Sequence, residues 1–508
     1  MHTKIFSATT VGIDAKLIEV EIDLAYGLVQ WNIVGLPDAA IKESKQRIQA
    51  ALKNGGLRIP DRKITINLAP ADIRKEGTMF DVPIALGILE AAEHVKLDLA
   101  FRNETIFLGE LSLDGAIKPV RGVLAIASEM QRLNKKRIIV PKANAIEAAA
   151  ISGIEVIAVE HLLQLLSYLR KEQHIEPVVF PRYEVARNEA LDFAHVRSQR
   201  AAKRACQIAA AGRHNIIFIG SPGSGKTMLA ERLSSIMPDM THDEIIETTK
   251  LYSISGKLDT DKSLITVRPF RNPHHTTSQA GLVGGGSIPQ PGEISLAHNG
   301  ILFLDELLEF KRSVLEVLRQ PLEGKTISLA RAQQTLTFPA SFLLVAALNP
   351  CPCGYFGDKK RHCSCAPQAV HNYLQKLSGP LLDRIDIQVA VSSIGNEVFE
   401  NVHEQSSSEL YEGVLKALTM QKNRFGKNGA YNSGLKAEDI EIYCTRTAEA
   451  QSLVEQAFVN LNLSMRGYHK LLKLARTIAD IDFVDVIEKK HIQEALMYRS
   501  LDSVLGKR

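Results

Sequence analysis

One stretch of the chain, "NIIFIGSPGSGKTMLAERL" at residues 215–233, leaves little choice of local fold. A short apolar strand, the pattern GxxxxGKT and an amphipathic helical pattern follow one another, which is the context of a phosphate-binding loop. Glycines let the loop turn its backbone N–H groups towards phosphate oxygens, and the helix N-terminus adds its positive dipole. A glycine-rich turn with a solvated lysine is the alternative. The predicted nucleotide-binding residues are Gly220, Ser221, Pro222, Gly223, Ser224, Gly225, Lys226 and Thr227.

Two later strands end in polar residues that suit the same site. Lys226 would reach the β- and γ-phosphates of ATP, and Thr227 would give a hydroxyl to Mg²⁺. The strand in "GILFLDELLEF", 300–310, leads to Asp305 as a further Mg²⁺ ligand and to Glu306 as the group that polarises the attacking water. The strand "SFLLVAALNP" ends in Asn349, which either orients that water or senses the γ-phosphate, or only begins a turn before a proline.

Composition limits the class of protein. The chain has 508 residues, 45% of them apolar and 23% charged, as in ordinary globular proteins with two or three domains. Its first residues carry charges where a signal peptide needs an apolar run, and no apolar stretch reaches the ~20 residues that span a bilayer. We therefore expect a cytoplasmic protein with reduced thiols and no membrane partner. The net charge of +4 permits a nucleic-acid partner without requiring one.

Hydrophobic periodicity predicts a mixed α/β fold in three blocks. Apolar strands and helical stretches alternate over 1–170 and again over 191–395, and 396–508 is almost entirely helical by pattern. Residues 171–190, with charges, two prolines and little periodicity, are predicted to be a linker.

Four of the six cysteines lie in "NPCPCGYFGDKKRHCSC", as two CxC pairs. A disulfide cluster, a redox centre, a metal site and chance are the possible readings, and a reducing compartment disfavours the first. Reduced thiols brought together by a glycine-containing loop suit tetrahedral structural Zn²⁺, although zinc ribbons ordinarily use CxxC. The predicted ligands are Cys351, Cys353, Cys363 and Cys365, and His362 or His371 could replace one of them. Cys206 and Cys444 are expected in the core.

The order of these motifs resembles the AAA+ ATPases. The magnesium-chelatase-like branch and its relatives, the MCM helicases, have the same order of motifs. In this chain the order is the phosphate loop, "LFLDE", "ALNP", "GPLLDRIDI" and a helix opening with "SMRGYHKLLKLARTIAD". Four further stretches narrow the resemblance to the ComM (YifB) family of bacterial Mg-chelatase-like ATPases. They are "RPFRNPHHTTSQAGLVGGG", "NPCPCGYFGD" and the N-terminal "VGIDA" and "IVGLPDAAIKES". The match runs over almost the whole chain. It implies an AAA+ domain with pore insertions, followed by a helical lid.

The resemblance also implies a ring, for which hexamers are usual. Arg384 in "LLDRID" matches the arginine finger that completes the site of the neighbouring subunit, by placing a cation against the γ-phosphoryl oxygens. Arg466 in "MRG" matches the sensor-2 arginine of the lid. Surface arginines in ordinary ion pairs are the alternative for both.

Two insertions match segments that face the central pore of such rings. Residues 324–340 read as two strands with a turn, and Arg331 near the tip with Lys325 at the base could grip DNA phosphates. Residues 271–292 match the second insertion, in which Arg271, His274 and His275 offer donors to a DNA backbone. A purely structural pair of histidines is equally compatible with that pattern.

The N-terminal block resembles the proteolytic domain of Lon, a Ser–Lys peptidase with a ribosomal S5 domain 2-like fold, but departs from it at the reacting residues. "KEG" at 75–77 is followed by Thr78, Met79 and Phe80 where a nucleophilic serine is expected, and the expected general-base lysine is replaced in "PVRGVL", 119–124. A leucine cannot take a hydroxyl proton. The resemblance therefore predicts a retained fold without the dyad, used in ring assembly or as a second DNA-facing surface. Thr78 as a displaced nucleophile is the alternative.

Two functions of different classes follow from the resemblance. The first is a homo-hexameric ATPase that threads single-stranded, forked or branched DNA and drives unwinding or branch migration while incoming DNA recombines during natural transformation. The second is a chelatase-type remodeller that acts on a protein partner. A chaperone-like NTPase is also compatible with the sequence.

Overall fold

The computed structural model describes residues 2–59, 61–181, 190–258, 264–286, 289–330, 335–358, 360–392, 403–426 and 430–499. They form two compact units. Unit 1 comprises Met1–Glu184 together with Ile245–Ile265, and unit 2 comprises Val185–Glu244 with Thr266–Arg508. The segment 245–265, which the sequence pattern assigns to the ATPase block, thus belongs to the N-terminal unit. No helix among the described residues is long and apolar enough to cross a membrane.

Unit 1 contains a mixed four-stranded sheet of order β1-β2-β4-β3. Its strands are β1 (His2–Val11), β2 (Asp14–Ala25), β3 (Trp31–Val34) and β4 (Lys63–Ala69); only β3 and β4 run parallel. The alternation of buried and half-buried residues along β4 shows that one face of the sheet is more deeply covered than the other. Helix α2 (Asp81–Ala91) is buried over almost its whole length and packs on β1 and β2. Gly87 permits this approach, since an added Cβ would lie 2.6 Å from Ile22.

A second sheet of unit 1 is parallel, with the order β5-β8-β9. Its strands are β5 (Thr105–Phe107), β8 (Arg137–Pro141) and β9 (Glu155–Val159), and a short antiparallel pair joins β6 (Glu110–Leu111) to β7 (Ile117–Lys118). The remaining helices are α1 (Ala39–Asn54), α3 (Leu99–Glu104), α4 (Val123–Arg132), α5 (Ala145–Ala149), α6 (Leu162–Leu169) and a 3₁₀ turn, Lys142–Asn144.

The segment 245–265 is bonded into unit 1 by polar side chains. The Ser253 hydroxyl donates to the buried carboxylate of Glu147 and accepts from the backbone N–H of Gly122 at 3.0 Å. Lys250 donates to the Ser128 hydroxyl at 2.7 Å. Both Ser253 and Glu147 are buried, so these hydrogen bonds satisfy groups that would otherwise be costly to desolvate.

Unit 2 is built on a five-stranded sheet of order β11-β14-β17-β10-β18, in which all neighbouring strands are parallel. The strands are β10 (Ile216–Ile219), β11 (Phe270–Arg271), β14 (Ile301–Leu304), β17 (Leu343–Leu348) and β18 (Ile387–Ala390). Helices cover both faces of such sheets, so the central strands read as continuous apolar runs. Every residue of β14 and β17 is buried accordingly.

The helices of the sheet layer have between four and 13 residues. They are α7 (Arg200–Gly212), α8 (Lys226–Arg232), α10 (Gln279–Val283), α11 (Glu293–Leu296), α12 (Arg312–Glu316), α13 (Arg319–Gly324), α14 (Pro367–Leu374) and α15 (Gly379–Leu382), with 3₁₀ turns at Phe193–His195, Leu233–Ile236 and Leu307–Glu309. Helix α9 (His242–Ile254) begins in unit 2 and ends in unit 1.

Two antiparallel strand pairs are inserted, in chain order, between consecutive strands of the main sheet. They are β12 (Gly284–Gly285) with β13 (Gln290–Pro291), and β15 (Thr326–Ala330) with β16 (Thr335–Pro339). The second pair confirms the two-stranded pattern expected for 324–340 and begins two residues after α13 ends.

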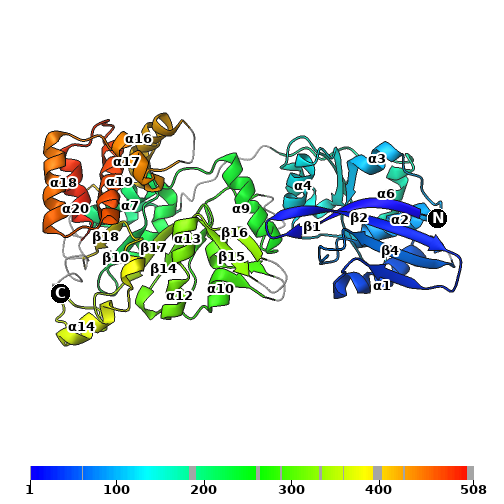
Figure 1. Cartoon of the computed structure of the whole chain (residues 1–508), viewed down its shortest axis with the longest axis horizontal. Helices are drawn as coiled ribbons and strands as arrows, with labels where there is room; N and C mark the ends of the chain where they lie inside the picture. Colours follow the sequence, from blue (N-terminus) through cyan, green and yellow to red (C-terminus); the bar gives the residue numbers. More distant parts are fainter. Residues whose placement is uncertain are drawn as a thin grey trace. The chain divides into compact units, whose positions relative to one another are not determined.

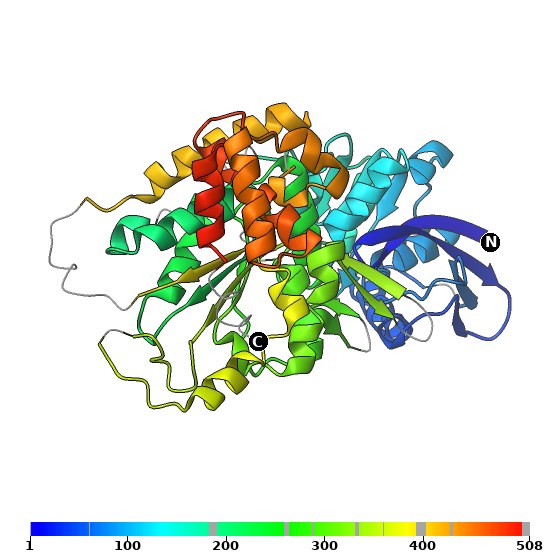
Figure 2. The same cartoon turned by 60° about the vertical axis from the view of Figure 1, so that its left-hand side comes forward.

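The C-terminal part of unit 2 is helical. It consists of α16 (Ser407–Phe425), α17 (Ala437–Tyr443), α18 (Ala448–Asn460), α19 (Met465–Ile481), α20 (Lys489–Met497) and a 3₁₀ turn, Asn432–Gly434. Figures 1 and 2 show these helices, in orange and red, gathered into one bundle. Ser464 caps α19 by accepting from the Gly467 N–H, as its sequence predicts. The apolar stripe of α19 joins one hydrophobic core with α7, β10 and β18.

Candidate nucleotide-binding site

The phosphate loop leaves β10, an inner strand of the sheet between β17 and β18, and enters α8. Gly220 passes so close to β18 that an added Cβ would lie 2.3 Å from the carbonyl oxygen of Val391. Gly225 has φ 93°, a left-handed conformation that other residues adopt only at a cost, and it is the residue from which α8 begins. Both glycines are therefore required by the backbone, whatever the loop binds.

The Lys226 ammonium is held inside this loop. It donates to the carbonyl oxygens of Gly220 (2.6 Å) and Ser221 (2.9 Å) and to Oδ1 of Asn349 (3.2 Å). Burial lowers the pKa of Lys226, whereas the carboxylates of Asp305 and Glu306 oppose that shift. The amine therefore lies among oxygen acceptors at the edge of the sheet where β10 and β17 end.

The acidic pair follows β14, the other neighbour of β17. Thr227 donates its hydroxyl to Oδ2 of Asp305 at 3.0 Å, and the Glu306 N–H donates to Oδ1 of Asp305 at 2.9 Å. The carboxyl ends of parallel strands meet at one edge of a sheet, and ligands of open α/β folds bind there. The structure thus brings together the phosphate loop, Asp305, Glu306 and Asn349, as the sequence predicts.

This donor set fits Mg²⁺ and a triphosphate. Thr227 and Asp305 supply the hard oxygen ligands that Mg²⁺ prefers, and successive N–H groups at the start of α8 suit phosphate oxygens. The buried hydroxyl of Ser224 has no hydrogen-bond partner among the residues described, which leaves one polar group of the loop able to receive a ligand. Glu306, with half of its side chain exposed, is open to water.

A contact that sequence reasoning missed joins the acidic pair to an insertion. His275 Nδ1 lies 3.4 Å from Oε2 of Glu306, and its ring stacks on His274 with centroids 4.1 Å apart. His275 contacts the carboxylate that is expected to polarise water, and His274 bonds to the hydroxyl of Thr276. DNA contact by either histidine stays a prediction, beside the purely structural alternative.

The two arginines expected to act on a neighbouring subunit share one counter-ion. Arg384 Nη2 lies 2.5 Å from Oε1 of Glu323, and Arg466 Nη2 lies 3.2 Å from the same oxygen. Glu323 is the penultimate residue of α13, directly before the β15–β16 hairpin. No feature of the sequence singled out Glu323, because nothing local distinguishes it from other exposed carboxylates.

The cations assigned to DNA have different surroundings. Arg271 forms a bidentate ion pair with Glu293, with distances of 2.6 and 2.9 Å. Lys325 lies at the hairpin base with its amine close to Gly434 in the helical bundle, and desolvation together with nearby Arg213 lowers the pKa of Lys325. Arg331, at the expected hairpin tip, lies outside the described residues.

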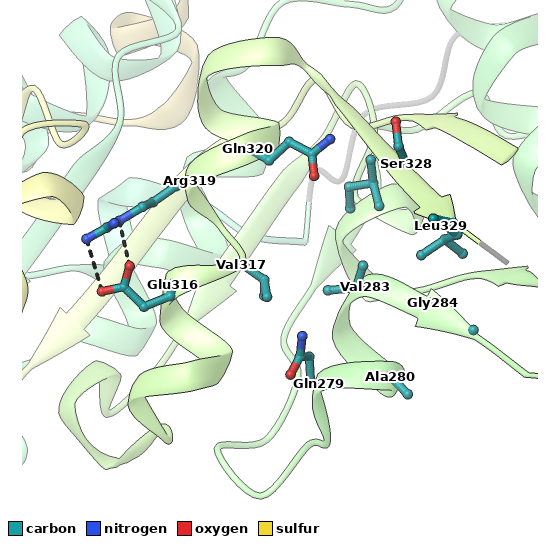
Figure 3. Close-up of a pocket in the computed structure, with 13 residues that line it drawn as sticks. Gln279, Ala280, Val283, Gly284, Glu316, Val317, Arg319, Gln320, Ser328 and Leu329 are labelled. Atoms are coloured by element: carbon teal, nitrogen blue, oxygen red, sulfur yellow. Dashed lines mark hydrogen bonds and ion pairs between the residues drawn. The ribbon is translucent and has the colours of Figure 1, made fainter. Parts of the chain in front are cut away.

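The two insertions face each other across a cavity of about 710 Å³. Figure 3 shows Gln279 and Ala280 of α10 on one side and Ser328 and Leu329 of β15 on another. The end of α12 and the start of α13 form a further wall, where Glu316 and Arg319 are ion-paired. The cavity is therefore lined by amides, a hydroxyl and apolar side chains rather than by one dominant charge.

The four clustered cysteines converge as their spacing predicts. Their sulfur atoms all lie within 4.8 Å of one another, in an arrangement that could hold a metal ion. Cys351 Sγ is 3.3 Å from Cys353 Sγ and 3.6 Å from Cys363 Sγ. These separations are far above the ~2.05 Å of a disulfide, and all four thiols are free. His371, considered as a substitute ligand, contacts Gln375 instead. Cys206 and Cys444 are buried in the core of unit 2.

The Lon-like positions of unit 1 are engaged in separate contacts. The Thr78 hydroxyl donates to Glu110, and the buried Lys75 amine donates to the carbonyl oxygen of Pro70. Burial lowers the pKa of Lys75, with Asp72 opposing the shift. Asp81, four residues after Gly77, is buried and paired with Arg47 at 2.6 Å. The loss of peptidase activity stays a prediction.

Comparisons with known proteins agree with this architecture. Family models described as "Subunit ChlI of Mg-chelatase", "Magnesium chelatase, subunit ChlI" and "Magnesium chelatase, subunit ChlI C-terminal" match residues 20–144, 192–399 and 404–499. The chain is 41% identical over 510 residues to "Competence protein ComM" of Haemophilus influenzae, which covers 99% of this chain and 98% of that protein.

Two further relatives extend the comparison. The chain is 39% identical over 507 residues to protein YifB of Escherichia coli, covering 99% of this chain and 97% of that protein. A more distant match is "Zygotic DNA replication licensing factor mcm6-B" of Xenopus laevis, 20% identical over 295 residues, with 56% of this chain and 32% of that protein covered. Full-length similarity and the phosphate loop with its acidic partner strand lead to one conclusion: the chain belongs to the ComM and YifB family of Mg-chelatase-like AAA+ ATPases.

Proposed function

We propose that this ATPase is a homo-hexameric DNA translocase that uses ATP hydrolysis to unwind DNA and drive branch migration when incoming DNA recombines during natural transformation. Lys226 and the loop amides hold the phosphates, and Thr227 with Asp305 would hold Mg²⁺. Glu306 would polarise the attacking water, and Asn349 would position it. Bound Mg²⁺ supplies charge neutralisation between the phosphates.

The observation that carries the DNA proposal is the placement of the insertions. The β15–β16 hairpin begins two residues after α13 ends, and the second insertion holds His275 against Glu306. A substrate that displaces the second insertion therefore acts close to Glu306. The name of the ComM relative points to competence, and that of the distant relative points to DNA replication.

The arginines complete the proposal for a ring. Arg384 and Arg466 both contact Glu323 within one chain. In an assembled ring, Arg384 would exchange this carboxylate for the γ-phosphate held by the adjacent subunit, where a delocalised cation stabilises the charge of the transition state. Arg466 would do the same from the helical lid.

The four thiols are proposed to hold one structural Zn²⁺. Zn–S bonds of ~2.3 Å in a tetrahedron place sulfurs roughly 3.8 Å apart, and three of the sulfur pairs are separated by 3.3–3.6 Å. Metal analysis of protein purified without chelator should give about one Zn²⁺ per chain. Cys363→Ser should lose metal and thermal stability together, because binding of a structural metal is part of folding.

The decisive experiment uses forked DNA and a four-way junction. Arg331→Ala should lose DNA stimulation of ATP hydrolysis and strand separation far more than it loses DNA-independent hydrolysis. Its binding should weaken equally on all sequences, with a shallower dependence on salt, because phosphates carry no sequence information. Lys436→Ala, which removes an exposed cation from the helical bundle, is the matched control.

A chelatase-type remodeller is the second candidate, favoured by the descriptions of the matching family models. It predicts a wild-type protein that neither unwinds DNA nor hydrolyses ATP faster in its presence. That result would overturn the DNA proposal. Equal unwinding by wild type and Arg331→Ala would instead remove the hairpin as the site of grip.

A further inference from the structure

The cysteine loop, residues 350–365, touches the phosphate loop through one carboxylate. Asp358 accepts the hydroxyl hydrogen bond of Ser221 on Oδ2. Its other oxygen, Oδ1, accepts the backbone N–H groups of Lys360 (2.7 Å) and Arg361 (3.1 Å). Asp358 therefore has one oxygen bonded within its own loop and the other bonded to the second residue of the GxxxxGKT motif.

A second contact between the same loops is steric. Gly354 has φ 87°, and a Cβ added there would lie 2.6 Å from Cδ and 2.8 Å from Cγ of Pro222. No larger residue fits without moving the phosphate loop. A third connection runs through the backbone, because Cys351 lies two residues after Asn349, whose side chain accepts from Lys226. Two successive residues of the phosphate loop, Ser221 and Pro222, thus have the cysteine loop beside them.

The cysteines close the segment that makes these contacts. Cys351 and Cys353 precede Gly354 and Asp358, while Cys363 and Cys365 follow them, and the four sulfurs lie within 4.8 Å. Bringing the two ends of this segment together removes conformations in which Asp358 would leave Ser221. A metal ion at the four thiols would make that closure part of the folded state.

The charge of Asp358 argues against direct phosphate binding, because a carboxylate repels phosphate oxygens. Its hydrogen bond to Ser221 gives it a different use, which is to fix the position of the loop backbone. We propose that the cysteine loop is a clamp that positions the phosphate loop for nucleotide, with Asp358 as its positioning residue. The part that the metal plays in this clamp rests on the zinc site of the proposed function.

The test measures equilibrium binding of Mg²⁺·ATP in a Glu306→Gln background, so that hydrolysis does not interfere. Asp358→Ala should keep its metal and thermal stability but weaken binding about tenfold, as expected for loss of one hydrogen bond to a charged group. Asp358→Asn keeps an oxygen that can accept from Ser221 and should recover part of the loss. Glu438→Ala, an exposed acid of the helical bundle, should bind as the parent does.

A double-mutant cycle separates positioning from general damage. Asp358→Ala should add little to the defect of Ser221→Ala, because both substitutions remove the same hydrogen bond. Metal is removed separately with a zinc-selective chelator that is filtered out before Mg²⁺ and nucleotide are added. The metal-free protein should show about the same loss as Asp358→Ala, and the two losses should not add.

Each result decides between the two proposals. Binding by Asp358→Ala within twofold of its parent overturns the clamp, whatever the metal content. If the purified wild type contains no metal but Asp358→Ala still weakens nucleotide binding, the zinc site is overturned and the contact between the loops is supported. If zinc is confirmed in the purified protein but its removal leaves nucleotide binding equally tight, the metal has no role in the clamp.

Discussion

His275 contacts Glu306, with Nδ1 of the imidazole 3.4 Å from Oε2 of the carboxylate. His275 belongs to the insertion between β11 and α10, and Glu306 follows β14. The carboxylate that should polarise water is therefore held by a segment that is not part of the sheet. A movement of that segment would therefore change what the Glu306 carboxylate contacts.

Glu306→Gln should bind Mg²⁺·ATP about as tightly as wild type while its turnover falls by roughly 10² or more, since an amide cannot act as a general base. Lys226→Ala, which removes the amine that bonds the loop carbonyls and Asn349, should instead lose binding. Nucleotide affinity and single-turnover hydrolysis measured on both variants check this division of roles. Near wild-type turnover by Glu306→Gln would remove that residue from the chemical step.

His275→Ala should raise DNA-independent hydrolysis about threefold, because the Glu306 carboxylate then loses its contact with the insertion, and such part-exposed contacts are worth up to about 1 kcal/mol. Stimulation by DNA should shrink in proportion, since the contact to be released is already absent. His274→Ala is the matched control, as His274 stacks on His275 but bonds to Thr276. If both variants hydrolyse ATP at the wild-type rate, with and without DNA, the contact has no regulatory use.

Arg384→Ala should be inactive alone but recover part of its ATPase activity when mixed with Lys226→Ala protein. Random mixed rings contain interfaces at which an intact phosphate loop faces an intact finger. The assay is ATP hydrolysis over a series of mixing ratios, in assemblies shown by mass measurement to contain both variants. A flat response across that series would mean that each site is complete within its own chain.

Asp386 should make part of the free energy of unfolding of unit 2 depend on pH. Burial alone would raise its pKa, but the Lys470 ammonium at 2.9 Å and the hydrogen bond with His214 hold the pKa of Asp386 well below its usual range. An acid with a lowered folded pKa stabilises the protein above its unfolded pKa, about 3.9, and this stability is lost as pH falls through the folded pKa.

The comparison is wild type against Asp386→Asn, by urea unfolding at several pH values. Asp386→Asn should cost about 3 kcal/mol at pH 7, because it leaves the Lys470 ammonium without its buried counter-charge. The difference between the two proteins should narrow as pH falls below about 4. A difference that stays constant with pH would show that Asp386 is not the titrating group.

Much of the nucleotide site could be predicted because its parts are encoded locally. Each central parallel strand reads as an apolar run, and the polar residue after it is placed at the same edge by the topology. The contacts of Thr227 with Asp305 and of Lys226 with Asn349 follow from that rule. The cysteines converge for a similar reason, since two CxC pairs a few residues apart can be joined by a single loop.

The contacts missed by sequence reasoning join residues that are distant in the chain. Glu323 meets Arg384 and Arg466, which lie 61 and 143 positions further on, and Asp358 meets Ser221 across 137 positions. An exposed carboxylate has the same local pattern whether or not it has such a partner. Segment 245–265 was likewise assigned by its place in the sequence, whereas its polar contacts lie in the N-terminal unit.

That interleaving has a practical consequence for any truncation of the protein. No single cut of the polypeptide releases two complete units. Deletion of 1–184 leaves segment 245–265 in the remaining fragment, where Ser253 and Lys250 have lost their partners. A defect seen after such a deletion would report the exposure of these groups as much as the lost domain.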